Sequence, residues 1–356
     1  FKDKVSMSNL CQEITLPTTP IQDIHDDQGE IALCILSAVN VGGLNDLGEL
    51  ENICDLAVRA LEQIIDYQDY PVKAAEVSTK KRRSLGIGYI GLAHYLAKHG
   101  VKYSDPKAWD LVDRLSEAFQ YHLLKASNNI AKEKGKCEAF DRTKYADGLL
   151  PIDHYKKDVD KIVPHKQRMA WESLRKDIAK HGLRHSTLSA QMPSESSSVV
   201  SNETNGIEPP RALLSIKKSK KGPLKQIAPG FPKLKNDYTL LWDMPDNTGY
   251  INVVAMMQKY FDQAISGNWS YNPTHFENNE VPLSVMANDM LTAYKLGWKT
   301  SYYQNTYDFK GDDEDVQPAG LSATIDTDDG EDVELPENLI SSDTDIDGED
   351  CDACTI

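Results

Sequence analysis

Residues 31–66 read IALCILSAVNVGGLNDLGELENICDLAVRALEQIID, and this stretch decides the fold class. Its first six residues form a short apolar run followed by small residues, which is typical of a buried strand and its turn. From position 46 to 66, apolar side chains recur every three or four residues, which predicts an amphipathic helix. The predicted core face is Leu50, Cys54, Val58, Leu61 and Ile65. Cys54 is therefore interpreted as a core residue rather than a reactive one.

The same alternation continues along the rest of the chain. Helical periodicity and β-forming runs predict helices at 107–135, 171–181, 249–267 and 282–297, and strands at 10–16 and 184–188. Short strands that alternate with helices predict an α/β layer or barrel with parallel strands. A linker that begins near Lys310 divides the chain into a body of residues 1–311 and a tail of residues 312–356.

The tail differs sharply from the body in its charge. It carries 17 Asp or Glu residues, no Lys or Arg and no aromatic residue, whereas the body is close to neutral. Such a segment cannot bury enough apolar surface to offset the entropy lost on ordering. We therefore predict that the tail is flexible and disordered.

The overall composition excludes several classes of protein. The 356 residues carry a formal net charge of −16, whereas binding to nucleic acid needs a basic surface. No run of 18 uncharged apolar residues is present, so no membrane span is predicted. The start of the chain, from Phe1, has no initiator Met and no apolar signal core, so we expect a cytoplasmic protein. The six cysteines show no regular spacing, which argues against a secreted disulfide scaffold.

Residues 86–91 match the pattern G-x-G-x-x-G, which also occurs in dinucleotide-binding proteins. That motif must follow a hydrophobic strand, whereas Lys80–Arg83 are all basic here. We therefore interpret the glycines as sites of close helix packing and not as a nucleotide site.

The segment Ser8–Glu13 carries the sharpest candidate chemistry. In a strand, Asn9, Cys11 and Glu13 would project from one face. The amide can hold a hydroxyl, the carboxylate can take its proton, and the thiol can exchange an electron or a hydrogen atom. This set suits work on a polyol. A solvent-facing edge strand is the alternative interpretation.

Three further segments have both a functional and a structural interpretation. The serine-rich run 193–198 follows a predicted strand, and its hydroxyls and backbone N–H groups could bind an anion or only cap a helix. Tyr302 and Tyr303 are adjacent phenols, which on their own indicate only a strand. Cys351 and Cys354 could close a disulfide on a mobile tether, and no His or second Cys pair lies nearby to complete a zinc site.

Together these segments resemble the large, catalytic subunit of class Ia ribonucleotide reductase. The resemblance covers nearly the whole chain and is carried by Ser8–Glu13, Gly29–Cys34, Leu85–Gly88, Ser189–Glu195, Asn205–Arg211 and Tyr302–Thr306. Only the C-terminal half of that subunit is matched. The resemblance therefore implies half of a ten-stranded α/β barrel with a central finger loop that carries Cys11.

The resemblance also implies a role for each residue near the sugar. Cys11 would be the thiyl radical that removes the ribose 3′ hydrogen, and Glu13 would take the 3′-hydroxyl proton. Asn9 would bind the sugar hydroxyls, with Ser8 beside it in the substrate site. Cys34 would be one of two thiols that are oxidised as the 2′-hydroxyl leaves as water.

The remaining candidates would bind phosphate, carry the radical or reset the thiols. The substrate diphosphate would lie on Pro193, Ser194, Glu195, Ser196 and Ser197. Tyr302 and Tyr303 would relay the radical from a tyrosyl radical near a di-iron site on a separate small subunit. Cys351 and Cys354 would reduce the active-site disulfide and be reset by thioredoxin or glutaredoxin. No metal or cofactor is expected on this chain.

The expected activity is reduction of ribonucleoside diphosphates to deoxyribonucleoside diphosphates, the precursors of DNA. The family's N-terminal half carries the allosteric nucleotide sites, the rest of the barrel and the partner thiol of Cys34. Our hypothesis is that a separate polypeptide supplies that half. One alternative is a non-catalytic subunit that keeps only the contacts with the small subunit and thioredoxin. Another is a glycyl-radical enzyme, which has a similar barrel and finger-loop cysteine but needs a radical-bearing Gly near its C-terminus.

Overall fold

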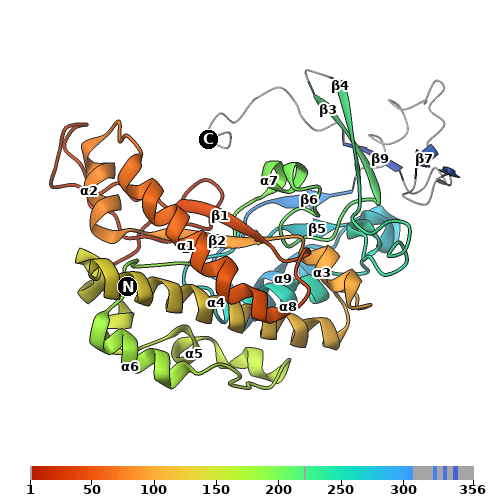
Figure 1. The fold of residues 1–356 in the computed structure, drawn as a ribbon. Coiled ribbons are helices and arrows are strands. Elements are labelled where there is room, and N and C mark those ends of the chain that lie inside the picture. Colours follow the sequence, from red (N-terminus) through yellow and green to blue (C-terminus); the bar gives the residue numbers. More distant parts are fainter. Residues whose placement is uncertain (1, 220–221, 308–323, 327–331, 335–339, 344–356) are drawn as a thin grey trace.

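A computed structural model describes residues 2–219, 222–307, 324–326, 332–334 and 340–343 (Figure 1). Its helices are α1 (Leu50–Tyr67), α2 (Lys73–Arg82), α3 (Leu92–Lys98), α4 (Pro106–Lys134), α5 (Pro151–His154), α6 (Trp171–His181), α7 (Glu195–Val200), α8 (Thr248–Gln258) and α9 (Leu283–Leu296). Its strands are β1 (Ile35–Asn40), β2 (Leu85–Ile90), β3 (Leu214–Ser219), β4 (Gly222–Ile227), β5 (Trp269–Tyr271), β6 (Gln304–Thr306), β7 (Thr324–Asp326), β8 (Asp332–Glu334) and β9 (Ile340–Asp343).

A row of parallel extended segments forms the framework of the fold. β1 pairs with β2 in parallel over the full length of both strands. The extended segment 187–191 lies along the other edge of β2, and residues 263–266 lie beside 187–191 in turn. A parallel bridge or backbone hydrogen bonds join each of these segments to its neighbour. Residues 263–266 lead into β5, which pairs in parallel with β6. The prediction of an α/β fold with parallel strands is confirmed, although the row does not close into a barrel within the described residues.

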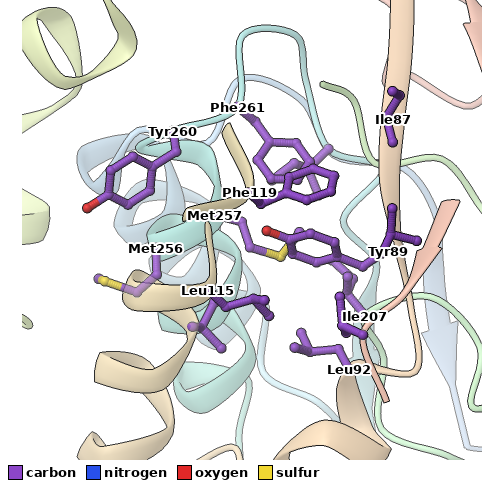
Figure 2. Close-up of a cluster of buried hydrophobic side chains, with 14 of the residues drawn as sticks. Ile87, Tyr89, Leu92, Leu115, Phe119, Ile207, Met256, Met257, Tyr260 and Phe261 are labelled. Carbon is purple, nitrogen blue, oxygen red and sulfur yellow. The ribbon is translucent and has the colours of Figure 1, made fainter. Parts of the chain in front are cut away.

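Helices cover this row and bury its apolar side chains. α1 packs against β1 and α4, and α4 packs in turn against α8 (Figure 1). Figure 2 shows Tyr89 of β2 pointing into the cluster, beside Phe119 of α4 and Phe261. Its ring lies 4.7 Å from the Phe119 ring and 5.4 Å from the Phe261 ring, both in edge-on contact. Each such pair adds about 0.5–1.5 kcal/mol beyond simple burial. The strand row and the helices therefore share one core.

Most of the predicted helices are confirmed. α1, α4, α6 and α9 match the predicted segments to within a few residues, and the five residues of the predicted core face of α1 are all buried. Cys54 is wholly buried, and burial raises the pKa of its thiol, as expected for a core residue.

Two predicted boundaries are wrong. The helix predicted at 249–267 ends at Gln258, and the chain then turns into the extended row. α8 is buried on almost every side, so its apolar pattern continues without a break into buried extended chain. The strand predicted at 184–188 is displaced toward its C-terminal end, because the segment paired with β2 is 187–191.

The glycine motif at 86–91 serves close packing, but not of helices as predicted. Gly86 and Gly88 lie inside β2. A Cβ atom on Gly86 would lie 2.8 Å from the Cys34 sulfur, and one on Gly88 would lie 2.7 Å from the Ala190 carbonyl oxygen. The glycines therefore let extended chain and the Cys34 thiol approach β2. A side chain at either position would displace them.

Most of the tail lies outside the described residues, including Cys351 and Cys354. The described parts are β7, β8 and β9, of which β7 pairs with β8 and β9 pairs in parallel with β3. The predictions of a flexible tail and of a domain boundary at 311 remain predictions. In the part of the chain that the structure describes, no helix has both the length and the apolar character needed to cross a membrane.

A buried carboxylate ties α1 to the residues just before the 187–191 segment. Glu62 is 1% exposed and accepts hydrogen bonds from Arg83 at 2.7 Å and Arg184 at 2.8 Å. The imidazole of His185, which is also buried, lies 3.1 Å away. Burial by itself would raise the pKa of Glu62, but bonds from His185, Arg83 and Arg184 outweigh it and lower the pKa from 4.5 to about 2.

We expect Glu62→Gln to lower the free energy of unfolding at pH 7 by about 3 kcal/mol, because it removes the buried anion that Arg83 and half-buried Arg184 share and leaves Arg83 paired with Asp66 alone. The folded pKa lies below the unfolded value, so this stabilisation is complete above pH 4.5 and is lost as the pH falls toward 2. Denaturant unfolding at several pH values measures both effects. Exposed Glu133, which pairs with Arg59, is the control, and Glu133→Gln should change little. Equal effects of the two substitutions would contradict the assignment.

Candidate active site around Cys11

Residues 9–13 form a tight turn, so the strand predicted at 10–16 is wrong at this point. The Gln12 N–H donates to the Asn9 carbonyl oxygen at 3.2 Å, and Gln12 has a φ of 69°. The Asn9 side-chain oxygen accepts the Ile14 N–H at 3.0 Å. Asn side chains compete with strand pairing in this way by binding nearby backbone groups. The turn brings Asn9, Cys11 and Glu13 together by a different route from the predicted strand face.

Glu13 is a buried carboxylate with a donor on each oxygen. It is 1% exposed, and it accepts the Asn9 amide at 2.8 Å and the Ser266 hydroxyl at 3.0 Å. The Ser266 hydroxyl is also within bonding distance of the Cys11 carbonyl oxygen, and the Ser266 N–H donates to Gln191 at 2.9 Å. Ser266 therefore links the turn to the extended row. A carboxylate held in this way is positioned to accept a proton from a bound hydroxyl.

The Cys11 sulfur lies inside the protein and next to a phenol. Its side chain is 8% exposed, and its thiol donates to the Tyr302 hydroxyl at 3.5 Å. The Tyr302 ring stacks on the Tyr303 ring, with 3.9 Å between their centres. Burial raises the pKa of the Tyr302 phenol, and its contacts with Cys11 and Tyr303 raise it further. Tyr303 is 57% exposed, so a chain of three contacting groups runs from the surface to the Cys11 sulfur.

Cys34 lies just before β1. It is half-buried and packs against Gly86 of β2. The Gln263 side-chain amide donates to its sulfur at 3.1 Å. Burial raises the pKa of the Cys34 thiol well above its usual range. It forms no disulfide with another described cysteine.

The serine-rich run forms the short helix α7 and the residues before it. Ser194 is buried, and its hydroxyl donates to the Met192 carbonyl oxygen at 3.0 Å. The Ser197 hydroxyl donates to the Ser194 carbonyl oxygen at 3.1 Å. Pro193, Glu195, Ser196 and Ser197 are exposed. The Ser198 hydroxyl likewise donates to the Glu195 carbonyl oxygen at 2.7 Å, so three of the hydroxyls bind the local backbone, and the start of the helix faces outward.

The structure connects the serine-rich run to the Cys11 turn. The Ser266 N–H donates to the Gln191 carbonyl oxygen, two residues before Pro193. Ser8 lies on the same turn and donates to the Ile14 carbonyl oxygen at 2.7 Å. The predicted site residues outside the tail are therefore linked through a few short contacts. In the described part of the chain, no three His, Cys, Asp or Glu side chains form a cluster suited to a metal ion.

Sequence reasoning missed two residues of this site. Ser266 and Gln263 follow α8 within a segment that was predicted to be helical. Neither belongs to a recognisable motif, and each acquires its role only when the chain leaves the helix and enters the row. The correct end of α8 was the signal that could have revealed them.

The arrangement places a buried thiol in contact with a pair of stacked phenols, and a buried carboxylate lies on the same turn as the thiol. Comparisons with known proteins match the same residues. The family model described as "Ribonucleotide reductase, barrel domain" matches residues 1–304. The chain is 58% identical over 313 residues to the ribonucleoside-diphosphate reductase subunit alpha of Haemophilus influenzae, which covers 88% of this chain and 41% of that protein.

Two further relatives have the same kind of name. The chain is 55% identical over 311 residues to ribonucleoside-diphosphate reductase 1 subunit alpha of Escherichia coli, covering 87% of this chain and 41% of that protein. It is 42% identical over 317 residues to the subunit alpha of Enterobacteria phage T4, covering 88% and 41%. The chain thus spans about two fifths of the length of these relatives.

Proposed function

Because the chain belongs to the ribonucleotide reductase family, in its barrel domain, we propose that it carries the radical chemistry of ribonucleoside-diphosphate reduction. The predicted family membership is confirmed. The observation that best supports the proposed activity is the position of Cys11: its buried thiol touches Tyr302 on one side and lies on the turn that holds Glu13.

The first proposed step takes place on Cys11 and Glu13. The Cys11 thiyl radical takes the hydrogen atom from C3′ of the ribose and becomes a thiol. Glu13 accepts the 3′-hydroxyl proton, and Asn9 holds the sugar hydroxyls. Ser266 supports this step because it holds both the carboxylate and the Cys11 backbone.

The second step reduces the sugar. The 2′-hydroxyl leaves as water after taking a proton. Cys34 and a second thiol together supply two electrons and two protons and become a disulfide. Cys11 then returns its hydrogen atom to C3′, and Glu13 returns its proton to the 3′ oxygen. Cys351 and Cys354 would reduce the new disulfide, becoming oxidised themselves, and thioredoxin or glutaredoxin would reset them.

We propose that the stacked pair Tyr302 and Tyr303 brings the radical to Cys11. A tyrosyl radical near a di-iron site on a separate small subunit would be its source. Stacked rings at 3.9 Å and a 3.5 Å contact with the sulfur suit short hops of one proton and one electron. The exposed Tyr303 is the end that a partner protein can reach.

The outward-facing start of α7 is our proposed site for the substrate diphosphate. The exposed first turn, with Pro193, Glu195, Ser196 and Ser197, supports this proposal, and backbone N–H groups at such a position favour anions. Catalysis would also need the part of the alpha subunit that this chain does not cover. We propose that this part supplies the remaining strands, the second thiol and the allosteric nucleotide sites.

The direct test is reconstitution. The chain is combined with the remaining part of the alpha subunit, the small subunit, a dithiol reductant and a ribonucleoside diphosphate. The proposed function predicts that deoxyribonucleoside diphosphate forms, and that none forms when the chain is left out. Assembly of a stable complex that forms no product would instead support the non-catalytic alternative.

We expect Glu13→Gln to reduce turnover of the reconstituted enzyme by about 10²–10⁴-fold, because the amide keeps the shape but cannot accept the proton. Steady-state rates on a ribonucleoside diphosphate measure the effect. Glu117 on α4 is an equally buried carboxylate outside the site, and Glu117→Gln should retain turnover at temperatures where the protein stays folded. Near-normal turnover of the Glu13 variant would rule out a role as proton acceptor.

A further inference from the structure

We propose that Gln263 is a positioning residue. Its side chain fixes the Cys34 sulfur in one place relative to the turn that carries Cys11. This assignment rests on the proposed function, and it adds to it a residue for the thiol half of the reaction.

The Gln263 side chain spans the two parts of the site. It is fully buried, and its Nε2 lies 3.1 Å from the Cys34 sulfur and 3.0 Å from the Leu85 carbonyl oxygen. The same nitrogen lies 3.3 Å from the Thr187 hydroxyl. At the other end of the amide, Oε1 accepts the Thr15 N–H at 3.2 Å. One end therefore holds the thiol, and the other holds the chain just after Glu13.

The backbone around Gln263 is held equally firmly. Its N–H donates to the Ser189 carbonyl oxygen at 3.0 Å, and the next residue, Ala264, donates its N–H to the Glu13 carbonyl oxygen at 3.0 Å. The Gln263 carbonyl oxygen accepts the Gln258 side chain and the Lys299 ammonium, both at 2.9 Å. A side chain on so fixed a backbone can hold a reacting atom within the narrow limits that catalysis needs.

The sulfur has little freedom opposite this amide. It lies against β2 where a Cβ atom on Gly86 would approach it to 2.8 Å. The Gln263 amide on one side and the backbone of Gly86 on the other therefore define the position of the Cys34 sulfur. A hydrogen bond from an amide N–H favours the thiolate form of a cysteine over the thiol.

The thiolate form matters when the disulfide is reset. Attack by a tail thiolate breaks the S–S bond, and one sulfur of the pair leaves as a thiolate before it gains a proton. Burial raises the pKa of Cys34, and the charges of Glu13 and Asp262, which face it from two segments, raise it further. The Gln263 bond acts in the opposite direction. Gln263 would therefore speed the step in which Cys34 leaves or reacts as a thiolate.

The test measures the alkylation rate of Cys34 against pH in the assembled complex, using iodoacetamide and mass spectrometry of the Cys34 peptide. Gln263→Met, which cannot donate a hydrogen bond to the sulfur, should raise the pKa of Cys34 further and slow alkylation at fixed pH by about tenfold. Gln263→Glu keeps an acceptor for Thr15 but brings a negative charge to the sulfur, and should slow it more. The matched control is Asn128→Met: Asn128 is also a buried amide, but it donates to the carbonyl oxygens of Asp177 and Gly182 and not to Cys34 or Gln263.

Alkylation rates that are unchanged at every pH in both Gln263 variants would overturn the assignment, and so would an equal slowing in Asn128→Met. Because alkylation needs no turnover, this result is independent of the proposed activity. In a complex that is active, Gln263→Met should slow multiple turnover with the tail dithiol more than the first turnover of prereduced enzyme. Equal slowing of the two would show that the amide supports only the fold.

Discussion

Replacing Cys11 with serine is expected to abolish reduction of ribonucleoside diphosphates by the reconstituted enzyme, with a loss of at least about 10³-fold. The hydroxyl is close to the thiol in shape, so the turn and its contacts should survive. An O–H bond is much stronger than an S–H bond, however, and a phenoxyl radical on Tyr302 cannot remove its hydrogen. The substitution therefore removes the radical carrier and leaves the rest of the site in place.

The control for this prediction is a second buried thiol. Cys137 is 1% exposed and lies outside the Cys11 turn, so Cys137→Ser should keep most of the turnover. Steady-state product formation, with thermal unfolding to confirm folding, measures both variants. Turnover by the Cys11 variant would exclude thiyl chemistry at this position. A binding subunit without catalysis predicts no effect of either substitution on activity of the complex.

Replacing Tyr302 with phenylalanine is expected to cause a comparable loss, of at least about 10³-fold. Phenylalanine keeps the stacked ring but removes the hydroxyl that contacts the Cys11 sulfur at 3.5 Å. Without an O–H group the ring cannot take and return a hydrogen atom, so the path from Tyr303 to Cys11 is broken. Substrate binding should be unchanged, because the proposed sugar and phosphate contacts come from other residues.

Tyr238→Phe is the matched control for the relay. Tyr238 is buried, and its hydroxyl donates to the Pro229 carbonyl oxygen at 2.7 Å, away from the Cys11 sulfur. The control variant should bind substrate and turn over at close to the normal rate. Turnover and equilibrium substrate binding are measured for both. If Tyr302→Phe retained more than a tenth of the activity, the relay would have to follow another route.

The periodic parts of the fold could be predicted from the sequence because each helix there has one buried face. α1 and α6 alternate apolar and polar residues at helical spacing, and their bounds agree closely with the prediction. The same reasoning failed after Gln258, where α8 and the following extended chain are buried on all sides. Periodicity carries no information where both faces are apolar. The glycines of β2 were misassigned for a related reason, since their neighbours come from distant segments.

The site residues could be proposed from their chemistry, but their geometry could not. The thiol, amide and carboxylate of the Cys11 turn were predicted to share a strand face, whereas the Asn9 side chain closes a turn instead. The stacking of Tyr302 on Tyr303 is likewise a tertiary result, because adjacent residues of a strand would point to opposite faces. The contacts of Ser266 with Glu13 and of Gln263 with Cys34 join residues more than 200 positions apart in the sequence.

Isotopic discrimination at the ribose tests directly whether the reaction removes the hydrogen atom at C3′. The reconstituted enzyme is given equal amounts of a ribonucleoside diphosphate with hydrogen and with deuterium at C3′, and mass spectrometry follows the remaining substrate. If the Cys11 sulfur removes this hydrogen, the unlabelled substrate should be consumed faster. The deuterated fraction of the remaining substrate should therefore rise as the reaction proceeds. Equal consumption of the two throughout the reaction, with normal product formation, would contradict removal of the C3′ hydrogen by the Cys11 sulfur.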